Sequence, residues 1–321
     1  MRALLIAHNS TVAQSIDFEH LDRELAVPGN QIWLDIERPQ EDDIALLRGE
    51  FHFHPLAIED ATRASERPKV DMYSDYYSLA FYATRLIGES GDLDLQPFHL
   101  FVGANYLVSI HERPLPEVVD SMARWQLKNG PLQPKIGAAV HALLDAVVDE
   151  YFPLMDQIAD RVDDLEDSLF TEYSPKSLET IFRLKKGLLN MRRVVAPERD
   201  VLNHLLRREL PVFSTEDVAY LQDVYDHLVR VTDSVDTYRD LLSNALDSFL
   251  SVQSNRLNEA VKVLTIASIL LMSSSLIAGI YGMNFVHMPE IQWPLGYAWA
   301  LGLMAAVSIT LILYFRWRKW L

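Results

Sequence analysis

The 321-residue sequence contains no cysteine, so disulfides and thiolate metal sites are excluded. The absence of cysteine is compatible with a protein that faces the cytosol. Positive charge is scarce. Residues 1–255 hold 24 lysines and arginines against 43 aspartates and glutamates, a net charge of −19. Such a surface repels the phosphates of nucleic acids, which we do not expect as partners, and it suits cations. An acidic surface also serves solubility.

Sequence motifs of common enzymes are missing as well. There is no Walker A loop, no HExxH and no serine nucleophile elbow. We therefore expect no enzymatic activity and no organic cofactor. The first apolar run, in MRALLIAHNST, has five residues, which is too short for the hydrophobic region of a signal peptide. The N-terminal body is expected to stay in the cytoplasm.

Two long stretches, 263–289 and 291–315, carry no charge at all. Each contains about 20 mainly apolar residues, enough to cross a hydrocarbon core of ~30 Å. Glu290 is the one charged residue between them. The sequence predicts transmembrane helices at 263–282 and 296–315, joined by an outer loop at 283–295. A pair of buried core helices is the alternative.

The cations near these stretches set the expected orientation. Arg256 and Lys262 precede the first stretch, and the tail 316–321 (RWRKWL) follows the second, whereas the loop 283–295 holds no cation. By the positive-inside rule, both termini are predicted to be cytoplasmic. We expect a multi-pass protein of the cytoplasmic (inner) membrane, with the lipid bilayer as a partner.

The first part of the chain, 1–130, mixes strand and helix patterns. Runs rich in aromatic and β-branched residues predict strands, and 103–105 is a hairpin turn. Two intervening segments read as short helices. An α/β domain is expected, with strands at 31–36, 76–86, 95–102 and 105–111 and helices at 41–50 and 55–65.

Residues 131–210 read as an antiparallel hairpin of long helices. Pro153 predicts a kink in the first, and Ser174 and Pro175 predict the N-cap and first turn of the second. The first helix is markedly acidic, which fits either a solvated face or a cation-attracting surface. Its acidic residues are Asp156, Asp160, Asp163, Asp164, Glu166 and Asp167.

Neither proline nor glycine occurs between Pro211 and Gly279. A helix from about Thr215 to 279–282 would hold some 65 residues and extend roughly 100 Å at 1.5 Å per residue. It would begin as a cytoplasmic stalk, 211–262, and continue through the membrane as 263–282. A helix of this length needs partners along its length, so an oligomeric bundle is expected.

One face of this helix mixes small, hydroxyl, amide and apolar side chains. If Asn284 faces a central axis, stepping back along the helix from Asn284 by three and four residues gives further residues on the same face. We call this set the stripe. The pattern fits a pore with a hydrophobic constriction, although helical steps can be made to fit other faces. The stripe consists of Gly279, Ser275, Met272, Ser268, Leu264, Val261, Asn258, Ser254, Leu250 and Asp247.

The segment YGMN at 281–284, at the outer end of the first span, resembles the signature of the CorA family of magnesium and cobalt channels. The following FVHMPEIQWPLGY and the closing WRKWL are similar to the magnesium branch. The zinc branch, of the ZntB type, shares the GMN motif but has a different, glycine-rich loop. HPLAIEDA (54–61), RPKV (67–70) and DVYDH (223–227) also resemble CorA segments.

This resemblance implies an α+β membrane protein that forms a homopentameric funnel. A cytoplasmic α/β domain would be followed by a stalk helix continuing into the first of two transmembrane helices. Gly282, Met283 and Asn284 would form the selectivity filter. A ring of amide oxygens suits hydrated Mg²⁺, which gives up its water reluctantly.

The implied function is passive influx of Mg²⁺ and Co²⁺, with Ni²⁺ as a further candidate. A divalent cation gains about 4.6 kcal/mol per 100 mV, so the membrane potential suffices as the driving force. Intracellular Mg²⁺ would favour closure by binding between subunits, at Asp60, with Glu59, opposite Asp223 of a neighbour. Alternatively, Asp60 and Glu59 decorate a surface helix.

Two other functions remain open at this point. One is zinc or proton-coupled divalent transport on the same scaffold. The other, from a different class, is a membrane-anchored scaffold or signalling protein, which would need no polar stripe.

Overall fold

The computed structural model describes residues 2–8, 14–15, 21–63, 67–87, 92–126, 135–171, 175–207, 212–285, 288–289 and 293–320. The chain divides into two compact units, Met1–Leu246 and Asp247–Leu321. One helix, α8 (Thr215–Tyr281), contributes residues to both.

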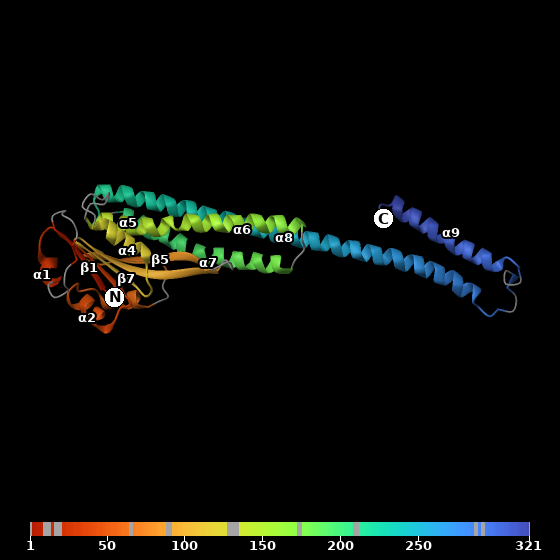
Figure 1. Cartoon of the computed structure of the whole chain (residues 1–321), viewed down its shortest axis with the longest axis horizontal. Helices are drawn as coiled ribbons and strands as arrows, with labels where there is room; N and C mark the ends of the chain where they lie inside the picture. The colour runs from red at the N-terminus through yellow and green to blue at the C-terminus, as the bar shows by residue number, and fades with distance from the viewer. Residues whose placement is uncertain are drawn as a thin grey trace. The chain divides into compact units, whose positions relative to one another are not determined.

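A mixed β-sheet organises the first unit (Figure 1). In the described part of the chain its strand order is β2-β1-β3-β7-β6-β5-β4. β3 and β7 pair in parallel, and the other neighbours are antiparallel. The strands are β1 (Arg2–His8), β2 (Gln14–Ser15), β3 (Asn30–Glu37), β4 (Lys69–Met72), β5 (Tyr76–Ile87), β6 (Asp92–Gly103) and β7 (Tyr106–His111).

Both faces of the sheet are buried, because alternate side chains of each strand point to opposite sides. In β3, Ile32, Leu34 and Ile36 are buried on one side. Three short helices cover that side and contribute Leu21, Leu47 and Ile58 to its core. They are α1 (Leu21–Ala26), α2 (Glu41–Gly49) and α3 (Pro55–Thr62).

Longer helices cover the other face. Trp33 of β3 points to this side, where its ring meets that of Trp125 edge-on at 5.9 Å between centroids. The helices are α4 (Pro116–Trp125), α5 (Ile136–Asp149), α6 (Tyr151–Thr171), α7 (Pro175–Leu206) and the first part of α8. α8 packs here through apolar residues three and four apart: Leu221, Val224, Leu228, Val231, Val235 and Leu242.

The predicted strands at 31–36, 76–86, 95–102 and 105–111 are confirmed as β3, β5, β6 and β7, and the hairpin at 103–105 is confirmed as well. The apolar run after Met1, considered above only as a possible leader, forms β1. Leu4 and Leu5 of this strand enter the two opposite cores.

The predicted kink at Pro153 is wrong in its position. The helix is interrupted at Glu150, between Asp149 at the end of α5 and Tyr151 at the start of α6. Proline lacks an N–H and clashes with the carbonyl four residues before it, here that of Asp149, so Pro153 disfavours an unbroken helix at this point. Pro153 instead lies in the first turn of α6, where a missing N–H is tolerated. The predicted N-cap, Ser174, lies outside the described residues.

The predicted long helix is confirmed. α8 has 67 residues and ends at Tyr281, within the expected 279–282. The second apolar helix, α9, runs from Gly296 to Trp317, two residues beyond the predicted end.

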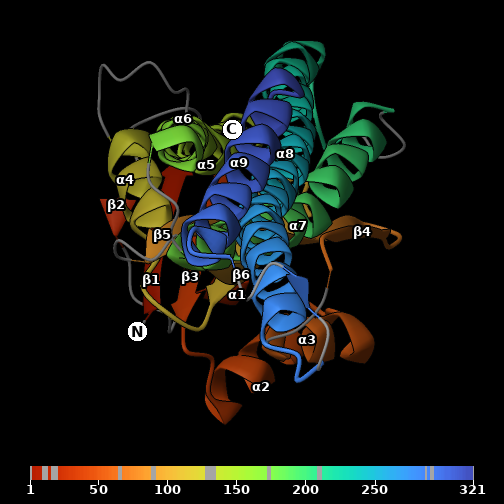
Figure 2. The ribbon, with the colours of Figure 1, turned by 90° about the vertical axis from the view of Figure 1, so that its right-hand side faces the viewer.

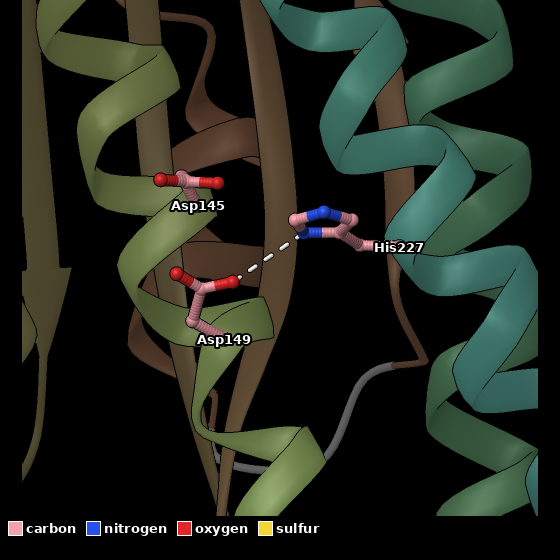
Figure 3. Close-up of side chains that lie close together, drawn as sticks. All are labelled: Asp145, Asp149 and His227. Atoms are coloured by element: carbon pink, nitrogen blue, oxygen red, sulfur yellow. Dashed lines mark ion pairs between the residues drawn. The ribbon is translucent and has the colours of Figure 1, made fainter.

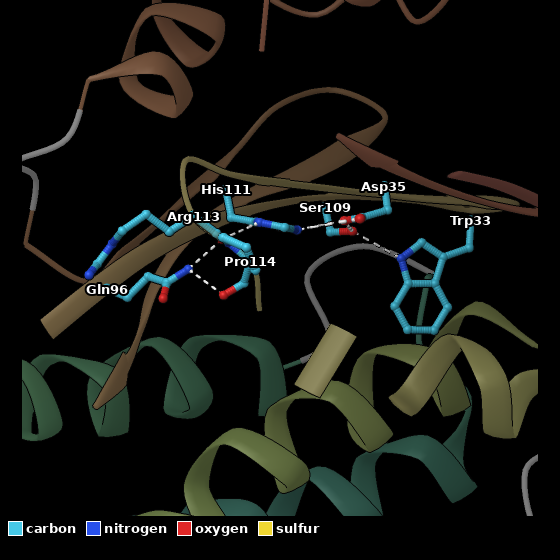
Figure 4. A network of polar contacts seen from close by, with 7 residues as sticks. All are labelled: Trp33, Asp35, Gln96, Ser109, His111, Arg113 and Pro114. Atoms are coloured by element: carbon cyan, nitrogen blue, oxygen red, sulfur yellow. Dashed lines mark hydrogen bonds and ion pairs between the residues drawn. The ribbon is translucent and has the colours of Figure 1, made fainter. Parts of the chain in front are cut away.

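A buried polar network joins β3 to β7 inside the first unit (Figure 4). Trp33 Nε1 donates a hydrogen bond to Ser109 Oγ at 3.1 Å, and this hydroxyl donates to Asp35 Oδ1 at 2.6 Å. His111 Nε2 lies 3.1 Å from the same carboxylate oxygen. Its Nδ1 lies 2.7 Å from the carbonyl oxygen of Arg113. Both ring nitrogens therefore face acceptors, an arrangement that suits a doubly protonated imidazole.

Opposing effects act on the pKa of His111. Burial lowers it, but the hydrogen bond and charge of Asp35, with the Arg113 carbonyl, outweigh burial, so the net pKa is raised above 6.5. The side chain is only 2% exposed, so the Asp35–His111 pair is a buried ion pair.

His111→Gln should destabilise the protein by about 3 kcal/mol at acidic pH, because it leaves the buried Asp35 carboxylate without its cation. The stabilisation from the proton is complete below the unfolded pKa of 6.5 and is lost as pH rises through the raised folded pKa. The cost of the substitution should therefore shrink at alkaline pH. Urea unfolding of the full chain, with exposed His204→Gln as control, measures this. An equal loss of unfolding free energy in His111→Gln at acidic and at alkaline pH would contradict a charged His111.

Candidate functional site

Two described helices, α8 and α9, are long and apolar enough to cross a membrane. The apolar part of α8 and the whole of α9 belong to the second unit. Their side chains are mostly exposed: only 6% of each apolar window is buried, unlike a core helix of a soluble protein. The alternative that these stretches are buried core helices does not fit this exposure.

Every one of the ten stripe residues, from Asp247 to Gly279, is exposed on α8. The exposure extends to large apolar side chains, since Leu264 is 67% and Met272 71% exposed. Within one chain, therefore, the structure leaves the stripe uncovered along its entire length.

α9 lies beside the last part of α8 (Figure 2), and the α8 side chains with reduced exposure there are not those of the stripe. Among them Ile266 is buried, and the half-buried side chains include Leu270, Ser273 and Ile277. The two helices are antiparallel. Lys262 Nζ donates to the Lys319 carbonyl at 3.3 Å, and near the other end Leu303 shares a cavity of about 270 Å³ with α8. At about 100° per residue, the covered face is centred roughly 150° from the stripe.

The GMN segment follows directly after the last residue of α8. The Gly282 N–H donates to the Ala278 carbonyl at 2.9 Å, and the Met283 N–H donates to the Ile280 carbonyl at 3.2 Å. The second bond spans three residues and tightens the final turn. Asn284 comes next and is exposed, as are Gly282 and Met283.

The backbone around Gly282 leaves little room for a side chain. A Cβ at this position would lie 3.1 Å from the Ala278 carbonyl oxygen, the acceptor of its own N–H, a contact tighter than most side chains tolerate. Any other residue would therefore push against the last turn of α8.

The predicted cytoplasmic cation ligands lie on two helices of the first unit. Glu59 and Asp60 belong to α3, and Asp223 belongs to α8. These helices pack on opposite faces of the sheet, so a single chain does not bring the predicted ligands together. Asp60 forms an ion pair with Lys69 at 2.7 Å, and Glu59 forms one with Arg63.

Asp223 instead borders a group of potential metal ligands that comes from α5 and α8 (Figure 3). Asp145, Asp149 and His227 place one ligand atom each within 4.8 Å of one another. His227 Nδ1 lies 3.4 Å from Asp149, and its Nε2 lies 3.7 Å from Asp223. We call these four residues the cation cluster.

Electrostatics of the cluster favour a cation. Burial raises the pKa of Asp145, and the neighbouring charge of Asp149 raises it further. Burial lowers the pKa of nearby His141, against the pull of the surrounding aspartates. The carboxylates therefore lack full compensation, and oxygen and imidazole ligands at this spacing could hold a divalent ion.

The sequence analysis did not identify Asp145, Asp149 and His227 as ligands. A usable signal was present: Asp145 and Asp149, like Asp223 and His227, are four residues apart and share a helix face. What the sequence did not show is that the two helices lie side by side.

Comparisons with known proteins agree with this architecture. Residues 29–318 match the family described as CorA-like Mg²⁺ transporter protein. The chain is 36% identical to the putative metal ion transporter YfjQ of Bacillus subtilis over 288 residues, covering 90% of this chain and 89% of the relative. It is 32% identical to the cobalt/magnesium transport protein CorA of Thermotoga maritima over 320 residues, covering 98% and 91%.

The fold also matches a solved structure over nearly its whole length. The complete CorA magnesium transporter of Methanocaldococcus jannaschii superposes with a TM-score of 0.83 at 23% identity, covering 99% of this chain and 98% of that one. This family comprises transporters rather than enzymes, and divalent cations are what it carries. The chain belongs to the CorA-like Mg²⁺ transporter family.

Proposed function

We propose that the protein is a passive channel for Mg²⁺ and Co²⁺, with Ni²⁺ as a further substrate, in the cytoplasmic membrane. The observation that carries this proposal is the stripe: ten residues of mixed polarity, all exposed, on a face of α8 that α9 leaves uncovered. Two serines of the stripe, Ser268 and Ser275, lie inside the predicted span, where neighbouring helices can accept hydrogen bonds from their hydroxyls and lipid cannot. A ring of α8 helices gives them a shared, water-accessible axis.

A homopentamer is the assembly we propose. Five copies of α8 would line the axis with the stripe, and five copies of α9 would form an outer ring towards lipid. The apolar side chains Leu250, Val261, Leu264 and Met272 would narrow the pore, a known way to gate by excluding water.

Asn284 is the proposed filter residue. It follows the tightened last turn of α8 at Gly282 and Met283, so five copies would meet where the pore opens outward. Amide oxygens accept hydrogen bonds from the water shell of Mg²⁺ without replacing it, so the ion can leave again. The membrane potential supplies about 4.6 kcal/mol per 100 mV for a divalent cation, and no ATP is needed.

Asn284→Ala should abolish Mg²⁺ uptake into liposomes under an imposed potential while leaving assembly intact, because an exposed amide contributes little to folding. The matched control is Leu295→Ala, at another exposed position of the outer loop. Assembly is checked by gel filtration. Normal uptake by correctly assembled Asn284→Ala would remove Asn284 from the mechanism. Comparing the uptake rates of Mg²⁺, Co²⁺ and Zn²⁺ in the same assay distinguishes a zinc transporter.

Both termini are proposed to be cytoplasmic, from the cations at Arg256, Lys262 and the tail. Because the chain has no cysteine, a single introduced cysteine reports its own location. Leu295→Cys, in the outer loop, should react with an impermeant thiol reagent in intact cells. Leu56→Cys, equally exposed in the first unit, should react only after lysis. The reverse result would overturn the orientation.

We further propose that intracellular Mg²⁺ favours closure by binding between cytoplasmic units. Asp60 and Glu59 of one subunit would face Asp223 of the next, where the cation cluster already concentrates negative charge. Asp60 is paired with Lys69 within the chain, so a bound ion would have to compete with that lysine. Opposed carboxylates repel, and a bridging ion converts this repulsion into attraction, which biases the equilibrium towards closure.

Asp60→Ala combined with Asp223→Ala should weaken inhibition by internal Mg²⁺, raising the half-inhibitory concentration about tenfold. Asp226→Ala, at an exposed position one turn along α8, is the matched control. Asp223→Lys should imitate the bridging cation by pairing with Asp60, making closure less dependent on Mg²⁺. Flux against internal Mg²⁺ concentration is the measurement. An unchanged inhibition curve for the double variant would exclude these residues as the sensor.

A further inference from the structure

α7 carries a glutamate that is completely buried. Glu198 has no exposed surface, although it lies in the middle of a helix beside Pro197. It packs against the sheet strand β5 and the first residue of α6, Tyr151. A buried carboxylate without a cation is costly. In the described part of the chain, Glu198 forms no ion pair, and its contacts are hydrogen bonds.

Two groups, the Tyr82 N–H and the Tyr151 hydroxyl, contact the carboxyl group of Glu198. The Tyr82 backbone N–H donates to Glu198 Oε1 at 2.9 Å. The Tyr151 hydroxyl lies 3.3 and 3.1 Å from the two carboxyl oxygens of Glu198. The same hydroxyl lies only 2.6 Å from the Tyr82 carbonyl oxygen.

The number of available protons limits which group can donate in each contact. A tyrosine hydroxyl has one proton, and a carbonyl oxygen can only accept, so the short 2.6 Å contact takes the proton of Tyr151. The contact between Tyr151 and Glu198 then lacks a proton unless the carboxyl group provides one. With a protonated Glu198 the contacts close into a ring: Glu198 donates to Tyr151, Tyr151 to the Tyr82 carbonyl, and the Tyr82 N–H to Glu198.

We propose that Glu198 is a proton-binding site of this protein: it holds a proton at neutral pH and donates it to Tyr151, and loss of that proton at alkaline pH opens the ring that ties α6 and α7 to β5.

The surroundings agree with a neutral Glu198. Burial raises its pKa to about 8, against the opposing effect of the Tyr82 N–H and the Tyr151 hydroxyl. On β5 and α4, Arg85 and Glu117 pair with each other at 2.6 Å. Arg199, next to Glu198 on α7, pairs with Asp200. Cations in this region thus already have acidic partners.

The ring occupies a sensitive place in the fold. Tyr151 begins α6 directly after the interruption at Glu150. The hydroxyl of Tyr151 is the polar tie between the start of α6 and β5, beside the apolar packing of Leu154 and Met155. Ionised Glu198 would compete with the Tyr82 carbonyl for the single proton of Tyr151, and one of the two bonds would be lost.

The pH dependence of the free energy of unfolding gives the first test. Glu198 is protonated in the folded protein but ionised in the unfolded chain between pH 4.5 and about 8, so protonation favours folding there. The stabilisation is complete below 4.5 and is lost as pH rises to about 8. Glu198→Gln, a neutral isostere that can still donate to Tyr151, lacks this dependence. The ratio of the wild-type unfolding constant to that of Glu198→Gln should rise about tenfold per pH unit in this window.

Urea unfolding of the full chain in detergent, followed by tryptophan fluorescence, measures this ratio. The matched control is Glu179→Gln, an exposed glutamate of the same helix that pairs with Arg183, and its ratio should change far less with pH than that of Glu198→Gln. A ratio for Glu198→Gln that does not change across the window, or one that falls with pH, would overturn the proposal.

Infrared spectroscopy tests the proton directly and does not depend on unfolding. The wild-type protein should show the C=O stretch of a protonated carboxyl group at neutral pH, and the band should disappear on alkalinisation. Tyr151→Phe removes the acceptor of the proton and should shift the band, which identifies it even if Glu198→Gln fails to fold. Absence of a protonated carboxyl band at neutral pH, or a band unaffected by Tyr151→Phe, would refute the assignment.

Discussion

The structure depends on one constraint: within a bilayer, every backbone N–H and C=O must find its partner inside the protein. An α-helix meets this demand only while nothing interrupts it. The chain has no proline or glycine from 212 to 278, and α8 runs unbroken for 67 residues, through its apolar span to Tyr281. That continuity allows one helix to supply core side chains to the first unit, ligands to the cation cluster, the stripe and the turn before Asn284.

Along α8, the burial of side chains changes where the helix passes from the first unit into the second. In the first unit, α8 buries apolar residues at intervals of three and four against α5, α6 and α7. Beyond Asp247 it exposes nearly every side chain, apart from the face that meets α9. Such exposure is unstable for a single chain in water. It becomes favourable when lipid covers one side and copies of the same helix cover the other, which is the assembly proposed here.

Local pattern was enough to predict the elements whose residues interact with near neighbours in sequence. The strands β5 and β6, the long helix α8 and its end near Tyr281 all follow from periodicity and from the positions of glycine and proline. β1 was missed because its short apolar run was considered only as a possible leader, not as a strand. The interruption at Glu150 was misplaced by three residues, because proline acts on the carbonyl four residues before it.

The candidate site, too, could be predicted only where its residues lie on one helix. The stripe and Asn284 could be read from one helix, whereas the cation cluster requires α5 and α8 to lie side by side. His227 and Asp149 are 78 positions apart, and no local rule pairs them. The ring around Glu198 joins residues 47 and 116 positions apart. Buried polar networks are specified by tertiary packing, so the sequence alone marks Glu198 as an ordinary helical glutamate.

The uninterrupted course of α8 also restricts how this protein can change over evolution. A single-residue insertion between Asp247 and Gly279 would rotate every later stripe residue by about 100° and turn the polar face towards α9. Within the predicted span, 263–282, a seven-residue insertion would nearly restore the angle, with a residual of about 20°, but would lengthen the span by about 10 Å and mismatch the bilayer. Insertions into the span are therefore disfavoured in both cases, while point substitutions that keep the register remain tolerable.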